Sequence, residues 1–322
     1  MSAPGPRAPC GRYAPSPTGP LHLGNLRTAL LAWMQARLAG GRFILRMEDL
    51  DRPRTRPGCA ETILEDMRWL GLDWDEGPDR GGPAGPYTQS RRGACYRRAL
   101  ETLRRRGALF PCYCSRKDIA QAASAPHGAP AGGVYPGTCR RRGNAAPGAV
   151  AGLRPPAWRY RAPERTVAFQ DAVMGPQAQA LAREAGDFVV RRADGLYAYQ
   201  LAVVVDDAGM GVTDVLRGAD LLDSAPRQIE LYRALGYRPP RFWHVPLLCD
   251  DRGRRLAKRD AGQSLRALRA RGMDAAAVVG CLAATLGWAA SGAALTARQL
   301  LERFDAGSFE AALRAAAKPT VT

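Results

Sequence analysis

The strongest constraint on this chain is residues 12–25, an extended segment that leads into a helix. Pro15, Pro17 and Gly19 turn the backbone before an apolar pattern with helical spacing begins. The apolar positions are Leu26, Leu30, Trp33, Ala36 and Ala39. A turn that ends at a helix N-terminus offers backbone N–H groups and the positive end of the helix dipole to an anion. The pattern therefore predicts an anion-binding turn and a helix that starts near Gly24.

Two polar side chains, His22 and Asn25, stand at the mouth of this turn, and Gly24 lets a ligand approach the backbone closely. They are candidates for binding a phosphate. Taken alone, however, a His-x-Gly-Asn string is more often a proline-rich loop with a satisfied histidine.

A short strand and an acidic segment follow. Gly40 and Gly41 end the first helix, and residues 42–47 read as a buried strand that runs into Glu48. A strand, a turn, a helix and a second strand form half of a doubly wound α/β fold, in which ligands bind at the carboxyl ends of the strands. Glu48 is therefore expected beside the turn. An acidic turn that caps the next helix is the alternative.

The composition points to a polyanion as a partner. The chain has 322 residues, enough for roughly two domains, and its formal net charge at pH 7 is +17. This excess is carried almost entirely by arginine, which pairs well with phosphate, so nucleic acid is the natural partner. No signal peptide opens the chain, no apolar run is long enough to span a membrane, and eight scattered cysteines do not resemble a disulfide framework. We therefore expect a cytoplasmic protein that binds no membrane. A monomer is expected as well, although the composition itself does not give the oligomeric state.

Three cysteines lie at spacings that suit a metal. Cys112 and Cys114 form a Cys-x-Cys pair, and Cys139 follows a segment rich in alanine, glycine and proline. Closely spaced cytosolic thiols favour tetrahedral Zn²⁺, because one ion can stabilise a region too small for its own core. A fourth ligand is needed, and His127 is the chemically usual candidate. Small buried cysteines without a metal are the alternative.

Several segments of the second half carry polar residues whose role the composition leaves open. Residues 197–207 read as a buried strand or helix, and residues 215–220 continue into a polar loop. Ser224, with Pro226 in the first turn, is expected to cap a further helix. Residues 254–259 form a basic segment after a glycine turn, which is often only a solvated hairpin.

Together these segments resemble the glutamyl branch of the class I aminoacyl-tRNA synthetases. Residues 12–25 are similar to the nucleotide-binding signature of the class, and residues 254–259 to its second, lysine-containing motif. Asn25 stands where other branches carry histidine, and Arg255 and Ala257 replace a lysine and a serine. Asparagine can still donate a hydrogen bond. The resemblance implies an α/β fold: a Rossmann-type nucleotide-binding domain with an inserted zinc-binding subdomain and a short helical C-terminal part.

The resemblance also implies two groups of site residues. The residues expected to bind glutamate are Arg12, Tyr13, Ala14, Pro15, Ser16, Glu48, Tyr199 and Arg217. The residues expected to bind ATP are His22, Gly24, Asn25, Arg255, Leu256, Ala257, Lys258 and Arg259. In such a site Glu48 holds the α-amino group of glutamate, while His22 and Lys258 act on the phosphates as the catalytic residues. ATP brings its own Mg²⁺ as part of the substrate.

A fourth zinc ligand is implied in the same way. In one short-chain subfamily of these synthetases, a Cys-x-Cys pair is followed by Tyr-x-x-x-Cys. Tyr135 stands four residues before Cys139, so the resemblance implies one structural Zn²⁺ held by Cys112, Cys114, Tyr135 and Cys139.

The implied parts of the chain are the first half of the catalytic domain (1–110), the zinc-binding subdomain (111–157), the second half with the basic loop (158–260), and the C-terminal region (261–322). This last part is short for an anticodon-binding domain, which takes about 100 residues. The expected activity is therefore that of a short paralogue. It activates L-glutamate with ATP in the absence of tRNA and transfers it to queuosine at the wobble position of tRNA(Asp). A truncated synthetase that charges the 3′ end of tRNA(Glu), and an inactive RNA-binding paralogue, are the alternatives.

Overall fold

The chain contains both strands and helices, as expected for an α/β protein, and it ends in four successive helices within the described residues. The computed structural model describes residues 8–115, 118–119, 134–142, 155–248 and 264–317. The strands are β1 (Cys10–Tyr13), β2 (Arg42–Leu45), β3 (Leu109–Cys112), β4 (Ala157–Tyr160), β5 (Thr166–Asp171), β6 (Gly175–Ala180), β7 (Phe188–Arg191), β8 (Asp214–Gly218) and β9 (Arg241–Val245). The α-helices are α1 (Leu23–Leu38), α2 (Cys59–Trp69), α3 (Gly93–Arg105), α5 (Thr138–Arg141), α6 (Leu181–Glu184), α7 (Tyr199–Gly209), α8 (Ala225–Leu235), α9 (Leu265–Ala270), α10 (Ala275–Ala284), α11 (Ala297–Leu301) and α12 (Ala306–Ala317). Short 3₁₀ helices are η1 (Arg52–Arg54), η2 (Gln89–Arg91) and η3 (Ala219–Ser224).

Four parallel strands form the centre of the molecule. β1 pairs with β2, and β8 pairs with β9, both in parallel. β1 lies beside β8, where the backbone N–H of Thr213 donates to the carbonyl oxygen of Cys10 at 2.9 Å. The strands therefore lie in the order β2, β1, β8, β9, with their carboxyl ends at one edge. The antiparallel hairpin of β5 and β6 continues the sheet beyond β9.

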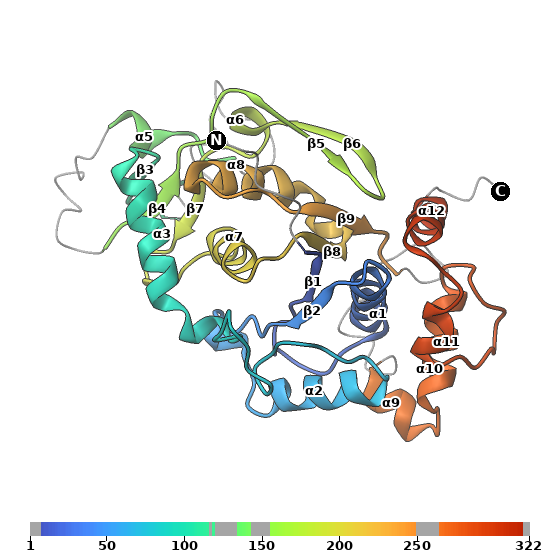
Figure 1. Ribbon diagram of the computed structural model, residues 1–322. Helices are drawn as coiled ribbons and strands as arrows, with labels where there is room; N and C mark the ends of the chain where they lie inside the picture. Colours follow the sequence, from blue (N-terminus) through green and yellow to red (C-terminus); the bar gives the residue numbers. More distant parts are fainter. Residues whose placement is uncertain (1–7, 116–117, 120–133, 143–154, 249–263, 318–322) are drawn as a thin grey trace.

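Helices cover both faces of these strands (Figure 1). On one face, α1 packs against the C-terminal helices α10, α11 and α12. On the other face, α3, α7 and α8 pack against one another. Each face has its own core, which includes Leu30 and Trp33 of α1 on the first face, and Val204 of α7 and Tyr232 of α8 on the second. This is the doubly wound arrangement that the sequence predicts.

Helix α1 carries the predicted turn into the centre of the fold. It begins at Leu23, close to the predicted start near Gly24. Its buried residues extend from Leu26 to Ala36, because the strands cover one side of the helix and the C-terminal helices cover the other. A helix enclosed in this way is apolar on most of its circumference.

The segment that reads as a strand or a helix is helix α7. It begins at Tyr199 and buries the two carboxylates Asp206 and Asp207. The predicted cap of the next helix is wrong, because Ser224 makes no capping hydrogen bond to α8. The backbone of Ser224 is already helical, since η3 runs directly into α8, and a cap residue needs an extended backbone. The Ser224 hydroxyl instead accepts a hydrogen bond at 3.0 Å from Nε2 of Gln200.

A second sheet lies at one end of the molecule, beside α5 (Figure 1). It consists of β3, β4 and β7 in antiparallel pairing. Phe110 of β3 packs with Cys112, Tyr135 and Cys139 in a small core of its own. The expected cysteine site therefore lies outside the two main cores.

The described residues from 264 onward are mostly helical, as predicted. Helix α9 lies beside α2, where the Arg269 guanidinium stands 5.0 Å from the ring centre of Trp69 and 3.9 Å from Oδ1 of Asp66. Within the part of the chain that the structure describes, no helix has the length and the apolar character to cross a membrane. The four-part division of the chain stays a prediction.

Candidate active site

One cavity lies at the carboxyl ends of the four parallel strands. Its volume is about 390 Å³, within the usual range of ligand sites. Its walls come from the segments that follow β1 and β2 and from the ends of β8 and β9. Many residues predicted to bind substrates line it, namely Arg12, Tyr13, Ala14, Pro15, Ser16, His22, Gly24, Asn25, Glu48, Tyr199 and Arg217. The fold thus joins stretches that are far apart in the sequence, while the role of each residue stays a prediction.

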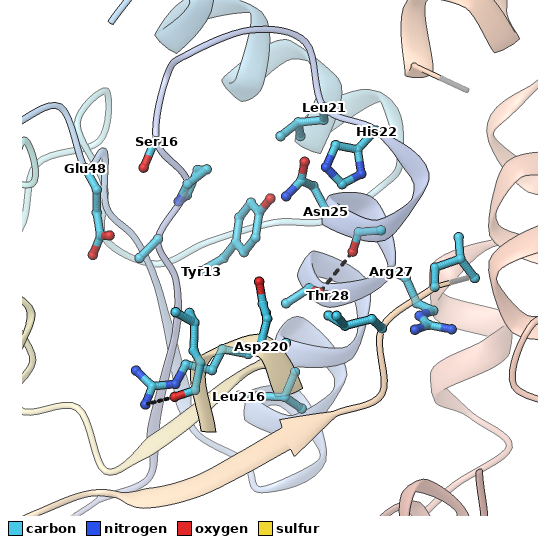
Figure 2. A pocket seen from close by; sticks show the side chains of 18 of the residues that line it. Tyr13, Ser16, Leu21, His22, Asn25, Arg27, Thr28, Glu48, Leu216 and Asp220 are labelled. Atoms are coloured by element: carbon cyan, nitrogen blue, oxygen red, sulfur yellow. Dashed lines mark hydrogen bonds between the residues drawn. The ribbon is translucent and has the colours of Figure 1, made fainter. Parts of the chain in front are cut away.

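The cavity has two ends (Figure 2). Ser16 and Glu48 lie at one end, His22 and Asn25 lie at the other, and Tyr13 stands between them. We call these two ends of the cavity the Glu48 end and the His22 end.

Arg12 at the Glu48 end is fixed by buried groups. Its Nη1 donates to the carbonyl oxygen of Leu216 at 3.1 Å, and its Nε lies 3.5 Å from Oδ1 of Asp207. The same oxygen of Asp207 accepts a hydrogen bond at 2.6 Å from Nη1 of Arg46. All three charged residues are buried. Asp207 therefore joins two arginines that would otherwise repel each other.

Glu48 continues this chain of charges. Nη2 of Arg46 donates to Oε1 of Glu48 at 3.0 Å. Burial raises the pKa of the Glu48 carboxyl above its ordinary value, and the Arg46 charge opposes this rise. A cation that arrives beside Glu48 would favour the ionised carboxylate further. This end of the cavity is therefore suited to an ammonium group.

Arg217 presents a second guanidinium at the same end. Its Nη1 donates to Oε1 of Gln228 at 2.8 Å and to the hydroxyl of Tyr199 at 3.4 Å. Burial lowers the pKa of Arg217, but arginine remains charged because its ordinary pKa is so high. A guanidinium held in this way can pair with a carboxylate.

A buried histidine supports Arg217 from behind. Nε of Arg217 donates to Nε2 of His244 at 2.9 Å, so the proton of the neutral ring is on Nδ1. Nδ1 then donates to Oδ2 of Asp171 at 2.6 Å. Burial lowers the pKa of His244, which keeps the ring neutral. Neither His244 nor Asp171 could be predicted from the sequence, since no motif distinguishes them before β9 and β5 are known to be neighbours.

The His22 end meets the N-terminus of α1, whose first turn contains no acidic residue. Leu248 lines the cavity, and Ser264 forms a β-bridge with His22. In addition, the backbone N–H of Leu265 donates to the carbonyl oxygen of Leu21 at 3.0 Å. The described chain on both sides of the basic segment therefore lies at this cavity. Its predicted ATP-binding residues, Arg255, Leu256, Ala257, Lys258 and Arg259, lie outside the described residues.

Four polar residues that were predicted to bind neither substrate also line the cavity: Thr18, Arg27, Thr28 and Asp220. Thr28 donates to the carbonyl oxygen of Gly24 at 2.9 Å, one turn earlier on α1. Because residues four apart share a helix face, the predicted helix could have indicated Thr28. Figure 2 shows the Asp220 side chain directed into the cavity from below. Asp220 lies just after β8, and only this position at the carboxyl end of the strand indicates that it belongs to the site.

The expected zinc ligands lie together at the second sheet. The Sγ atoms of Cys112, Cys114 and Cys139 are all within 4.8 Å of one another, and those of Cys114 and Cys139 are 3.5 Å apart. Three thiolates bound tetrahedrally at about 2.3 Å from one Zn²⁺ would be about 3.8 Å apart, so the cluster fits this ion. The Tyr135 hydroxyl lies 3.9 Å from Sγ of Cys114 and accepts a hydrogen bond at 2.7 Å from the backbone N–H of Cys139. His127, the other candidate, lies outside the described residues.

Known proteins share this sequence and this fold. A family model described as class I tRNA synthetases (E and Q), catalytic domain, matches residues 10–315. The glutamyl-Q tRNA(Asp) synthetase of Symbiobacterium thermophilum is 55% identical over 303 residues, which are 92% of each chain. The protein of the same name from Deinococcus radiodurans is 52% identical over 283 residues, 86% of this chain and 89% of that protein.

Solved structures of longer proteins are also similar. Glutamate-tRNA synthetase from Elizabethkingia anophelis has a TM-score of 0.78 at 29% identity, and the match covers 93% of this chain and 66% of that one. A glutamate tRNA ligase from Elizabethkingia meningosepticum has a TM-score of 0.77 at 28% identity, with 94% and 65% covered. This chain therefore spans slightly less than two thirds of those two proteins.

The fold and the cavity define the catalytic domain of a class I tRNA synthetase. Within that class, the chain belongs to the family of the glutamyl-Q tRNA(Asp) synthetases. The predicted fold class and the predicted glutamyl branch are confirmed.

Proposed function

We propose that this protein activates L-glutamate with ATP in the absence of tRNA and transfers the glutamyl group to queuosine at the wobble position of tRNA(Asp). The observation that carries the proposal is the cavity itself. Its Glu48 end combines a carboxylate with two buried guanidiniums, and its His22 end meets a helix N-terminus. The similarity to relatives named for this reaction supports the choice of substrates.

The Glu48 end would hold glutamate by its three charges. Glu48 would accept hydrogen bonds from the ammonium group, and Arg217 and Arg12 would each pair with a carboxylate. Tyr199 would form the wall between Glu48 and Arg217. Because the carboxylate is ionised at pH 7, activation needs no general base.

The His22 end would hold ATP. A carboxylate oxygen of glutamate attacks the α-phosphorus, the bond to the bridging oxygen breaks, and pyrophosphate leaves with the electron pair. Negative charge on the phosphate oxygens increases during this step, so fixed donors lower the barrier. His22 and the N-terminus of α1 would serve the α-phosphate, and Lys258 would serve the β- and γ-phosphates. Gly24 and Asn25 would contact the nucleotide, while Mg²⁺ would arrive with ATP.

The cysteine cluster would hold one structural Zn²⁺ through Cys112, Cys114, Cys139 and Tyr135. The ion would link β3 to α5 and so stabilise this part of the fold. A closed four-ligand site leaves no position for a substrate, so the ion would take no part in the reaction.

The partner would be tRNA(Asp), and the charge of +17 suits a polyanion. We propose a cytoplasmic monomer with the four-part division given above. The similarity to glutamate-tRNA synthetases favours one other candidate, a synthetase that charges the 3′ end of tRNA(Glu).

Two assays on the purified protein test the proposal. ATP–pyrophosphate exchange should require glutamate and no tRNA. Labelled glutamate should then be transferred to tRNA(Asp) that contains queuosine, and not to the same tRNA without it. A glutamyl ester on the terminal adenosine of tRNA(Glu) would instead favour the second candidate, and absence of exchange would indicate an inactive paralogue.

A further inference from the structure

A buried arginine of α1 lies across the cavity from Glu48. Arg27 follows Leu23, the first residue of the helix, by one turn, and it lines the cavity together with Thr28. Figure 2 shows Arg27 and Glu48 on opposite sides of the cavity. A guanidinium is costly to bury unless its N–H groups donate hydrogen bonds. The groups that accept from Arg27 therefore indicate what this residue does.

The guanidinium of Arg27 joins three parts of the chain. Its Nη2 donates to the carbonyl oxygen of Pro246, and its Nη1 donates to Oγ1 of Thr285 at 3.3 Å. Thr285 stands at the C-terminal end of α10, and its hydroxyl donates to the carbonyl oxygen of Leu282 at 2.6 Å. Because the hydroxyl proton is used there, an oxygen lone pair remains to accept from Arg27. Arg27 thus connects α1, the segment after β9 and α10.

The segment after β9 is one wall of the cavity. β9 ends at Val245, which is also the last residue of its pairing with β8. Pro246, Leu247 and Leu248 follow and line the cavity. These residues have left the sheet, so the ladder of backbone hydrogen bonds between β8 and β9 no longer determines their course. The hydrogen bond from Arg27 instead holds the first carbonyl group beyond the strand.

Both Arg27 and the wall that it holds belong to the nucleotide side of the site. Arg27 is part of α1, whose N-terminus lies at the His22 end. The wall leads along the chain into the basic segment, residues 254–259, which is predicted to bind ATP. A shift of this wall would therefore affect the binding of ATP first.

We propose that Arg27 is a positioning residue for ATP, which it serves by holding Pro246, Leu247 and Leu248 in place as a wall of the nucleotide site. This inference rests on the proposed function. Among the described residues, none from position 264 onward lines the cavity. The hydrogen bond from Arg27 to Thr285 therefore makes α10 a support of the ATP site from outside the cavity.

The Glu48 end is held by other contacts. Glu48 accepts from Arg46, and Arg217 donates to Gln228 and His244. None of these hydrogen bonds involves Arg27. Loss of the Arg27 guanidinium should thus weaken the binding of ATP and leave the binding of glutamate as it is, whereas general damage to the fold would weaken both.

Exchange kinetics of the full-length protein separate the two substrates. Arg27→Met removes the donors and keeps the length of the side chain, Arg27→Lys keeps one charged donor, and Thr285→Val removes only the acceptor on α10. Arg37→Met is a matched control, because Arg37 is another arginine of α1 that pairs with Asp73 and Asp75 and does not line the cavity. The KM for ATP, the KM for glutamate and the melting temperature are measured for each variant.

We expect the KM for ATP to rise about tenfold or more in Arg27→Met and about threefold or more in Thr285→Val, because each variant loses hydrogen bonds to a charged group. Arg27→Lys should lie between the parent and Arg27→Met. In all three variants the KM for glutamate should stay at the parent value, and the exchange rate at saturating ATP should approach that of the parent. Arg37→Met should lower the melting temperature and keep both KM values.

An equal rise of both KM values in Arg27→Met would overturn the inference. An unchanged KM for ATP in Thr285→Val would also overturn it, since α10 would then give the nucleotide site no support through Arg27. If Arg27→Met does not fold, Arg27→Lys and Thr285→Val decide the question by the same comparison.

Failure of the proposed function would be seen separately. If the parent shows no glutamate-dependent exchange, the proposed function fails, and equilibrium dialysis with labelled ATP replaces the kinetics. Weaker ATP binding in Arg27→Met and Thr285→Val than in Arg37→Met would then still support the role of Arg27, and equal affinities in the three variants would overturn it.

Discussion

The guanidinium of Arg217 donates from Nε to the ring of His244 at 2.9 Å, so a neutral histidine behind the cavity determines how this arginine is presented. His244 is itself held by Asp171, whose carboxylate also accepts from the backbone N–H groups of Val173 and Met174 at 3.0 and 2.9 Å. The position of Arg217 thus depends on contacts that begin at the end of β5.

Replacing His244 should therefore weaken glutamate binding. His244→Ala removes a buried hydrogen bond to a charged group, so we expect the KM for glutamate in exchange to rise about tenfold or more. His244→Gln, whose amide oxygen can accept from Arg217, should recover much of this loss. An unchanged KM in His244→Ala would show that Arg217 does not depend on His244 for its position.

Replacing Asp207 should also weaken glutamate binding. Asp207→Asn keeps the shape of the side chain but removes the charge between Arg12 and Arg46, so both thermal stability and affinity for glutamate should fall. We expect at least a tenfold higher KM for glutamate. Asp214→Asn is the control, because Asp214 accepts a hydrogen bond from Trp243 and does not line the cavity. Equal KM values in these two variants would contradict this role of Asp207.

Asp66 offers a prediction about pH and stability. Burial raises its pKa to about 6, with the Arg269 charge opposing the rise. The folded state thus binds this proton more tightly than the unfolded state does, and stability falls as the pH rises from about 4 to about 6. Asp66→Asn removes the buried charge, so it should stabilise the protein by about 1 kcal/mol or more at pH 8 and by little at pH 4.

Urea unfolding at the two pH values measures this difference. Glu302→Gln, a change at an exposed glutamate on another helix end, is the control and should show no such dependence on pH. If Asp66→Asn changes stability equally at pH 4 and pH 8, the carboxyl does not titrate between them.

The cysteine cluster should contain about one zinc ion per chain. Cys112→Ser and Cys139→Ser should lose the metal, whereas Cys59→Ser should keep it, because Cys59 stands on α2 and outside the cluster. Metal analysis and the melting temperature with and without a chelator provide the measurement. Retention of zinc in Tyr135→Phe together with its loss in His127→Ala would assign the fourth ligand to His127.

Lys258 should be needed for activation. Lys258→Ala removes a charge expected at the β- and γ-phosphates, so the exchange rate should fall about a hundredfold or more while the protein remains folded. Ala257→Ser changes the neighbouring residue by one neutral hydroxyl and should have only a modest effect. Exchange at the parent rate in Lys258→Ala would remove the basic segment from the mechanism.

Local patterns were sufficient to predict the elements around the site. The spacing of Leu26, Leu30 and Trp33 indicated α1, and the run at residues 42–47 indicated β2, because both elements are defined by neighbours in the sequence. The pairing of β8 with β9 was not predictable in this way. It depends on contacts between distant segments, and for that reason His244 and Asp171 could not be assigned to the site. Ser224 was assigned a capping role from its residue type, but the helical backbone of η3 prevents that role.

The contacts at the two ends of the basic segment affect the cost of ATP binding. Leu248 lines the cavity and Ser264 pairs with His22, so folding already holds the described residues on either side of the basic segment at the proposed nucleotide site. The entropy of bringing these two parts of the chain together is lost once, when the protein folds, rather than each time that ATP binds. Helix α9 maintains this arrangement through the hydrogen bond from Leu265 to Leu21. Mutations that loosen α9 would therefore transfer part of this entropic cost to the binding of ATP, and they would weaken nucleotide affinity without altering any residue in contact with the nucleotide.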